Sequence, residues 1–178
     1  MLHIQKLFFI LILGIVLSQS SMAKTNTKID KVIKTSIAGV TEVEAKQLIL
    51  TKAQHATIQK KAKAAVRTKV YRYYEIKKST STVAYGVLIT RKMRTKKATV
   101  LYVFNKAGEL KFSEIMAFGE PPEFKPNQQW MGQFQNASAS TELTMGKDIP
   151  TISGSTLSAR GISEGARIAR AIYQVILK

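Results

Sequence analysis

Four stretches between residues 66 and 118 are rich in β-branched and aromatic side chains, and they constrain the fold more than any other feature. The stretches read VRTKVYRYYEI, STVAYGVLIT, ATVLYVFN and LKFSEIMAF. Such residues are typical of strands, and Gly108, shortly after Asn105, predicts a hairpin between the last two stretches. The basic segment RKMRTKK, residues 91–97, fits an exposed turn between the second and third stretches. We therefore expect an antiparallel sheet of about four strands.

Helical patterns flank the predicted strands. Thr41 and Glu44 stand as a capping-box pair with apolar residues following at helical spacing, which predicts a helix over residues 42–64 with His55 exposed on it. Apolar residues also recur every three or four positions from Ile162 onward, which predicts a C-terminal helix. Residues 24–40 show no clear period and are predicted to form a basic linker. The sequence thus predicts an α+β fold with the sheet between an N-terminal and a C-terminal helix.

The composition excludes several classes of chemistry. The chain has 178 residues, a length typical of one domain, with no cysteine and only two histidines. Disulfides, thiolate metal sites and cysteine nucleophiles are therefore excluded, and histidine-based metal or triad chemistry has almost no side chains to use. We expect neither a metal site nor a set of catalytic residues in this protein.

The first 23 residues have the pattern of a secretory signal peptide. Residues 7–17, LFFILILGIVL, form an uninterrupted apolar run after a short polar start that contains Lys6, and Ser21 and Ala23 supply small residues before a cleavage point. The run is too short to span a bilayer comfortably. We expect residues 1–23 to be removed and the mature protein to work outside the cytoplasmic membrane, which in a Gram-negative cell is the periplasm. An uncleaved N-terminal anchor is the alternative.

Positive charge is concentrated in the first half of the mature chain. Residues 24–97 carry 19 Lys and Arg against 4 Asp and Glu, whereas residues 98–178 carry 8 against 7. Such a region is either a solvated basic surface or a docking face for an anionic membrane or an acidic protein. Nucleic acid is not expected as a partner, because the signal directs the chain away from it and no recognised nucleic-acid-binding motif is present.

The segment SGSTLS, residues 153–158, places hydroxyl groups around one glycine just before the predicted C-terminal helix. Gly154 permits a backbone conformation that other residues resist. The N–H groups that begin a helix lack partners and carry partial positive charge, so the hydroxyls can cap them or a phosphate can bind there. A P-loop is excluded, because the pattern G-x-x-x-x-G-K-[ST] is absent. The residues alone leave capping and phosphate binding open.

The same segment resembles the S-G-A-T-x-[ST] motif of the FMN-binding domain family. Members of this family include the flavin-bearing subunits of the sodium-pumping NADH:quinone reductase and of the Rnf complex. Upstream, GEPPEF resembles the family's E-T-P-G at Glu120 and Pro122, with a glutamate where glycine is usual, and QQWMGQF resembles its W-x-x-x-F stretch. Pro150 stands where many members have an aspartate. The resemblance is strongest over residues 85–177, and we expect the FMN-binding domain to cover residues 41–178.

The resemblance implies a covalently bound flavin. Members of the family hold FMN through a phosphoester to the threonine that matches Thr156, and a separate flavin transferase of the ApbE type makes this bond from FAD with a divalent metal. Aromatic residues such as Phe118, Trp130 and Phe134 are candidates to pack beside the flavin ring, with plain core packing as the alternative. The cofactor-binding residues expected from the resemblance are Thr156, Ser153, Gly154, Ser155, Leu157, Ser158 and Glu120.

These expectations combine into an exported FMN protein that carries electrons in the cell envelope, with a flavin transferase and a membrane redox complex or cytochrome as partners. The flavin would supply the electron chemistry, and the protein would supply its position and environment. One alternative is an FMN-binding sensory or interaction module that shuttles no electrons. Another is a basic envelope-binding protein without cofactor, in which SGSTLS only caps the helix.

Overall fold

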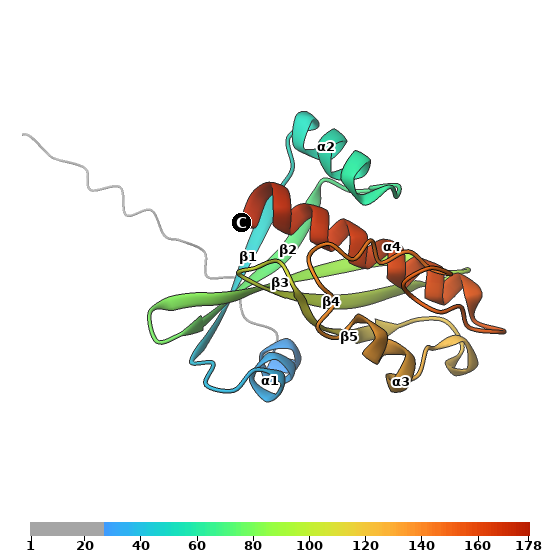
Figure 1. Cartoon of the computed structure of the whole chain (residues 1–178), viewed down its shortest axis with the longest axis horizontal. Coiled ribbons are helices and arrows are strands. Elements are labelled where there is room, and N and C mark those ends of the chain that lie inside the picture. The colour runs from blue at the N-terminus through green and yellow to red at the C-terminus, as the bar shows by residue number, and fades with distance from the viewer. Residues whose placement is uncertain (1–26) are drawn as a thin grey trace, which may run out of the picture.

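The computed structural model describes residues 27–178, so the predicted signal segment lies outside the described residues. One antiparallel sheet with the strand order β1-β2-β3-β4-β5 organises this part of the chain (Figure 1). Each strand pairs with the next strand in the sequence, and α2 is inserted between β1 and β2. In chain order the elements are α1 (Thr27–Ser36), β1 (Glu42–Ile49), α2 (Lys52–Ala62), β2 (Val70–Lys78), β3 (Ser81–Lys92), β4 (Lys97–Asn105), β5 (Leu110–Phe118), a 3-10 turn (Pro122–Phe124), α3 (Gln128–Met131), a second 3-10 turn (Gly132–Phe134), α4 (Thr156–Ile172) and a π-helical end (Tyr173–Leu177).

Both faces of the sheet are covered. Helices α2 and α4 lie on one side of it, and α1 lies on the other (Figure 1). The central strand β4 shows the consequence, because Val100, Tyr102 and Phe104 pack with α4 whereas Leu101 and Val103 pack with α1. Successive side chains of a strand point to opposite faces. A strand buried on both faces therefore needs apolar residues at every position, which accounts for the run VLYVF.

The predicted α+β class, with an antiparallel sheet and a C-terminal helix after the SGSTLS turn, is confirmed with five strands rather than about four. The additional strand is β1, which lies where a helix was predicted over residues 42–64. The first half of that prediction is wrong. Val43 and Ala45 of β1 are buried against the α1 side of the sheet, two residues apart as in a strand. The helical spacing of the apolar residues after them led to the wrong prediction.

Pairing with β2 overrides the helix propensity of Glu, Ala, Lys and Gln in β1. Lys46 Nζ lies 2.9 Å from Glu75 Oε2, and Lys77 Nζ lies 3.0 Å from Glu44 Oε2. Both contacts join β1 to β2 across the ladder, where opposite charges stabilise a strand pair. Residue types that favour a helix in isolation thus form an edge strand, because their partners are supplied by a distant segment.

The capping box of the region lies ten residues later than predicted. Thr51 accepts a hydrogen bond on Oγ1 from Gln54 N at 3.2 Å, and Gln54 Oε1 accepts one from Thr51 N at 2.9 Å. Helix α2 starts at this box.

His55 was predicted to be exposed, but it is half-buried and its Nε2 donates to the Val66 carbonyl oxygen at 2.9 Å. This hydrogen bond joins α2 to the segment that follows it.

The described part of the predicted linker, residues 27–40, is not structureless, because it contains α1. Ile29 and Ile33 lie one helical turn apart and are buried in the cluster on that side of the sheet. Lys34 Nζ lies 3.0 Å from Asp30 Oδ2, an i,i+4 pair that supports the helix. This helix contains three apolar residues, Ile29, Val32 and Ile33, too few for a visible period in the sequence. Within residues 27–178 no helix is both long and apolar enough to cross a bilayer.

The predicted hairpin at Gly108 is confirmed. Asn105 Oδ1 accepts hydrogen bonds from Ala107 N and Glu109 N at 3.0 Å each, and Gly108 adopts a φ of 83° between β4 and β5. A positive φ is easily adopted by glycine and rarely by other residues. The predicted turn over residues 91–97 is also present, because Met93 N donates to the Lys96 carbonyl at 2.9 Å where β3 turns into β4.

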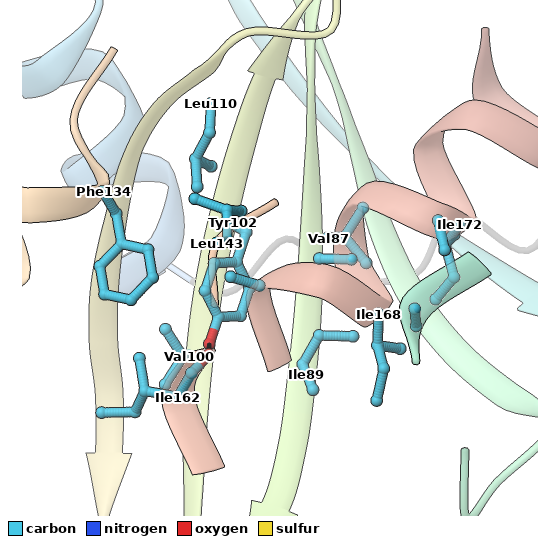
Figure 2. Close-up of a cluster of buried hydrophobic side chains, with 14 of the residues drawn as sticks. Val87, Ile89, Val100, Tyr102, Leu110, Phe134, Leu143, Ile162, Ile168 and Ile172 are labelled. Atoms are coloured by element: carbon cyan, nitrogen blue, oxygen red, sulfur yellow. Dashed lines mark hydrogen bonds between the residues drawn. The ribbon is translucent and has the colours of Figure 1, made fainter. Parts of the chain in front are cut away.

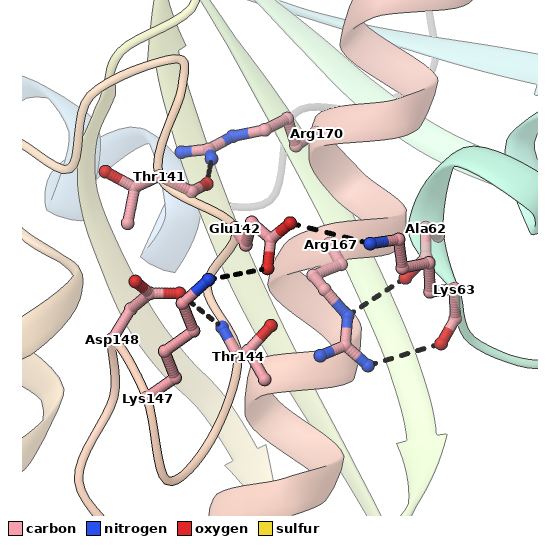
Figure 3. A network of polar contacts seen from close by, with 9 residues as sticks. All are labelled: Ala62, Lys63, Thr141, Glu142, Thr144, Lys147, Asp148, Arg167 and Arg170. Carbon is pink, nitrogen blue, oxygen red and sulfur yellow. Dashed lines mark hydrogen bonds and ion pairs between the residues drawn. The ribbon is translucent and has the colours of Figure 1, made fainter.

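Two arginines join α4 to the segments beside it (Figure 3). Arg167 Nε donates to the Ala62 carbonyl at 2.9 Å, which ties α4 to the end of α2. Arg170 is buried and donates to the carbonyl oxygens of Thr141 and Ala137 in the loop before α4. Burial lowers the pKa of Arg170 from its ordinary value. The Arg170 contacts hold residues 137 and 141 of the loop before α4 against the final helix.

Helix α4 approaches the sheet closely at one glycine. Tyr102 Oη donates to the Ile162 carbonyl at 2.7 Å, and Figure 2 shows this hydroxyl directed at α4. A Cβ at Gly165 would lie 2.6 Å from the same hydroxyl oxygen. The glycine therefore sets the distance between α4 and β4, and with it the position of the helix start.

Candidate functional site

The SGSTLS segment forms a tight turn that leads into α4. Gly154 has a φ of 78°, the left-handed conformation that its lack of a side chain permits. Ser155 N donates to the Ile152 carbonyl at 3.2 Å, and Thr156 Oγ1 donates to the same carbonyl at 3.0 Å. Thr156 is the first residue of α4, and its side chain is exposed. The turn thus presents the Thr156 hydroxyl at the start of a 17-residue helix.

The interpretation of these hydroxyls as helix caps is wrong. Ser155 occupies the N-cap position, yet no side chain caps the first turn of α4 in the described part of the chain. The Ser155 hydroxyl is buried and donates instead to the Glu123 carbonyl at 3.2 Å, which ties the GEPPEF segment to the helix start. The first N–H groups of α4 are left without a side-chain acceptor, and such a helix start favours an anion.

A pocket of 380 Å³ surrounds the helix start. Its lining consists of residues 154–158, Arg94 and Phe124. Gly154, Ser155, Thr156, Leu157 and Ser158 were all predicted, and the structure brings them together here. Two of the predicted residues do not line the pocket: Ser153, which is exposed in the same turn, and Glu120.

Arg94 and Phe124 are the residues that sequence reasoning missed. The Arg94 guanidinium carbon lies 5.1 Å from the centre of the Phe124 ring, within the range of a cation–π contact. Arg94 belongs to the basic turn between β3 and β4, and Phe124 belongs to the GEPPEF segment. Both segments were noted in the sequence, but nothing local shows that they meet at the start of α4.

Leu157 adds an exposed apolar surface to the pocket. It is one of the few large apolar side chains of the described residues that face solvent, with 45% of its surface exposed. Together with the Phe124 ring it gives one side of the pocket an apolar character, next to the Arg94 charge. This combination suits a ligand with an anionic group and a flat apolar body.

Glu120 does not face the pocket; it holds the β3–β4 turn. Its Oε1 accepts hydrogen bonds from the backbone N–H groups of Arg94, Thr95 and Lys96 at 2.9, 2.5 and 2.6 Å, and its Oε2 accepts one from Thr95 Oγ1 at 3.0 Å. Burial of this carboxylate acts to raise its pKa, but the hydrogen bonds from Lys96, Thr95 and Arg94 outweigh burial and lower the pKa to about 2. Glu120 therefore fixes the turn that carries Arg94.

Replacing Glu120 by glutamine is expected to destabilise the protein at neutral pH and to flatten its acid response. The folded-state pKa of Glu120 is about 2, below its ordinary value of 4.5. The stabilisation is therefore fully present above pH 4.5 and is lost as the pH falls towards 2. Urea unfolding of wild type and Glu120→Gln between these pH values should converge at the acid end. Glu123→Gln, at an exposed position nearby, is the control, and equal acid responses for wild type and Glu120→Gln would contradict this role.

The aromatic residues considered for the flavin ring lie elsewhere. Trp130 and Phe134 are buried in the main core with ring centres 5.3 Å apart, and Phe118 is partly buried against the same cluster. Trp130 Nε1 donates to the Pro150 carbonyl at 2.8 Å, which anchors the loop before SGSTLS. Core packing, the alternative interpretation, therefore describes Trp130 and Phe134.

The pocket fits a phosphate, and none of the described residues that line it could activate a hydroxyl. Arg94 and the uncapped helix start supply positive charge and donors, and the Thr156 hydroxyl stands in reach of solvent. Among residues 27–178, no Asp, Glu or His side chain lines the pocket. A threonine hydroxyl is a weak nucleophile without an adjacent base. The arrangement is thus suited to receiving a phosphate-linked group.

No family model matches this chain, and no curated protein matches it. The resemblance to the FMN-binding domain family therefore depends on the SGSTLS, GEPPEF and QQWMGQF segments themselves.

Proposed function

We propose that this protein is an exported FMN-binding protein that carries its flavin on Thr156 through a phosphoester and works as an electron-transfer carrier in the cell envelope. The observation that carries the proposal is the exposed Thr156 hydroxyl at the uncapped start of α4, in a pocket that is also lined by the positively charged Arg94. A helix start and a guanidinium both favour a phosphate. The resemblance of SGSTLS to the family motif names the phosphate-bearing group as FMN.

The protein would be the substrate of the attachment reaction. Because none of the described residues that line the pocket is a base, an external flavin transferase would remove the Thr156 proton. A bond forms between Thr156 Oγ1 and the phosphorus of the FMN half of FAD, the pyrophosphate bond of FAD breaks, and AMP leaves. The exposure of Thr156 is consistent with this reaction, because the transferase must reach the hydroxyl directly.

Each residue of the pocket has a defined part in this proposal. Arg94 and the first N–H groups of α4 balance the phosphate charge, while Phe124 and Leu157 offer apolar contact to the ring. Glu120 holds the turn that carries Arg94. Bound FMN supplies one- and two-electron chemistry that the side chains lack. The chain's own contribution is position, charge balance and partial shielding from water.

Co-production of the protein with a competent flavin transferase tests the proposal. The intact mass should rise by FMN less one water, and the band should fluoresce in a denaturing gel because the bond is covalent. A colourless, unlabelled protein would contradict covalent attachment and leave a basic envelope-binding protein as the better interpretation. Host membranes supplied with NADH should then bleach the absorbance of the bound flavin; an unchanged absorbance would favour a sensory module over a carrier.

A further inference from the structure

A concave basic groove lies beside the SGSTLS pocket. It has a volume of 700 Å³, and its cationic lining consists of Arg67, Arg91, Lys92, Arg94 and Lys97. These residues come from the segment after α2, from the end of β3 and from the turn into β4. In the part of the chain that the structure describes, no Asp or Glu side chain lines the groove. The charged side chains that line this hollow are therefore all positive, and we call it the basic groove.

Most of this charge is uncompensated. Arg91 pairs with Glu164 and donates to the Ala65 carbonyl at 2.9 Å. The other four cations have no carboxylate partner within residues 27–178. A hollow lined by like charges focuses the electric field and attracts ions of the opposite sign. The charge of the basic groove therefore favours binding of an anionic partner.

The centre of the basic groove is apolar. Tyr71, Ile89 and Ile168 line it and are themselves mostly buried. At its edge Val70 is 51% exposed and lies opposite Ile49, which is 66% exposed, in the β1–β2 register. Arg and aromatic side chains are enriched at protein–protein interfaces, and the basic groove presents three Arg side chains beside Tyr71.

The shape separates a protein partner from a membrane. The cations line a hollow, and the floor of a hollow is out of reach for the flat surface of a bilayer. A protruding protein segment can enter it and meet cations and apolar floor together. An amphipathic membrane-binding surface places its apolar side chains where they can enter the bilayer, whereas Tyr71, Ile89 and Ile168 are buried.

We propose that an acidic segment of a protein partner docks in the basic groove, with carboxylates against Arg67, Lys92 and Lys97 and an apolar side chain towards the floor. Arg94 lines both the basic groove and the SGSTLS pocket, so the docked segment lies next to the start of α4. The purpose of this docking rests on the proposed function: with FMN on Thr156, the partner is the protein that exchanges electrons with the flavin.

A peptide titration tests the docking without any flavin. The probe is a peptide of about ten residues with Asp and Glu around one Phe, followed by amide chemical shifts of the isotope-labelled protein. Shifts are expected at Val70, Thr90 and Lys92. The affinity should fall about tenfold when salt rises from about 0.01 to 0.15 M, because the Debye length shortens from about 30 to 8 Å. A peptide with Asn and Gln in place of the acids should not bind.

The decisive variant removes three charges from the basic groove. The triple substitution Arg67→Gln, Lys92→Gln and Lys97→Gln should weaken peptide binding at least about tenfold, because these cations meet the carboxylates. All three side chains are exposed, so the fold should be retained, as thermal unfolding would verify. Arg94 is left in place so that flavin loading of the variant is preserved.

The matched control removes the same net charge elsewhere. Lys31, Lys78 and Lys106 are exposed and lie outside the basic groove. Their joint replacement by glutamine should change peptide affinity less than about twofold, since only long-range charge is lost. Equal weakening by both triple variants would show a non-specific charge effect and overturn the proposal. Absence of shifts at low salt would overturn it as well.

Further outcomes distinguish the docking proposal from membrane binding and from the proposed flavin function. Vesicles with about 30% phosphatidylglycerol should bind more weakly than the peptide; tighter vesicle binding that the basic-groove variant abolishes would identify a membrane face instead. A protein that takes no FMN but still docks the peptide in the basic groove would refute the proposed function and retain the docking site. A flavin-loaded protein that fails to dock the peptide would refute the docking site alone.

Discussion

Replacing Thr156 by alanine is expected to abolish flavin attachment completely while leaving the fold intact. The substitution removes the only atom of the side chain that can form the phosphoester. Its structural cost is small, because Thr156 is exposed and loses one hydrogen bond to the Ile152 carbonyl, worth about 1 kcal/mol. Intact mass and in-gel fluorescence after co-production with a flavin transferase measure the label. Thermal unfolding of the same sample measures the fold.

Two companion variants sharpen this prediction. Thr151→Ala makes the same substitution at an exposed threonine of the same loop, outside the pocket, and should leave the label unchanged. Thr156→Ser retains the hydroxyl and should accept a reduced amount of flavin, since only the methyl group is lost. Full labelling of Thr156→Ala would place the flavin on another hydroxyl and contradict the proposed attachment site.

Replacing Gly165 by alanine is expected to destabilise the protein strongly. The new Cβ would lie 2.6 Å from Tyr102 Oη, and that hydroxyl is fixed by its hydrogen bond to the Ile162 carbonyl. Overpacking of a close contact costs about 1–3 kcal/mol, and we expect a net loss of about 2 kcal/mol in the free energy of unfolding. Alanine favours a helix by up to about 1 kcal/mol over glycine, so any loss reports the contact with β4. Urea unfolding provides the measurement.

A double-mutant cycle identifies the contact responsible. Tyr102→Phe removes the hydroxyl and should make Gly165→Ala far less costly, because the next nearest ring atom lies 3.3 Å from the new Cβ. Gly132→Ala is the control, because a Cβ there would meet no atom within 4 Å. Its effect should be within about 0.5 kcal/mol. Additive losses for Gly165→Ala and Tyr102→Phe would show that the hydroxyl does not set the distance between α4 and the sheet.

The candidate site was predictable in part. Gly154 and Thr156 could be placed at the start of a helix, because a glycine-containing turn and an apolar stripe are written in consecutive residues. The role of Ser155 could not, since its hydroxyl turns away from the helix to the Glu123 carbonyl. Arg94 lies about sixty residues before Thr156, and only the packing of the β3–β4 turn against the helix start brings them together.

Local sequence by itself determined the hairpin at Gly108, the four strands β2 to β5, the apolar stripe of α4 and the turn before it. Each depends on neighbours in the chain, so a short window contains the information. Tertiary structure decided that residues 42–49 form a strand, that Ile29 and Ile33 make α1 a cover for the sheet, and that Glu120 supports the turn of Arg94. These features depend on partners far along the chain, whose pairing and burial outweigh local propensity.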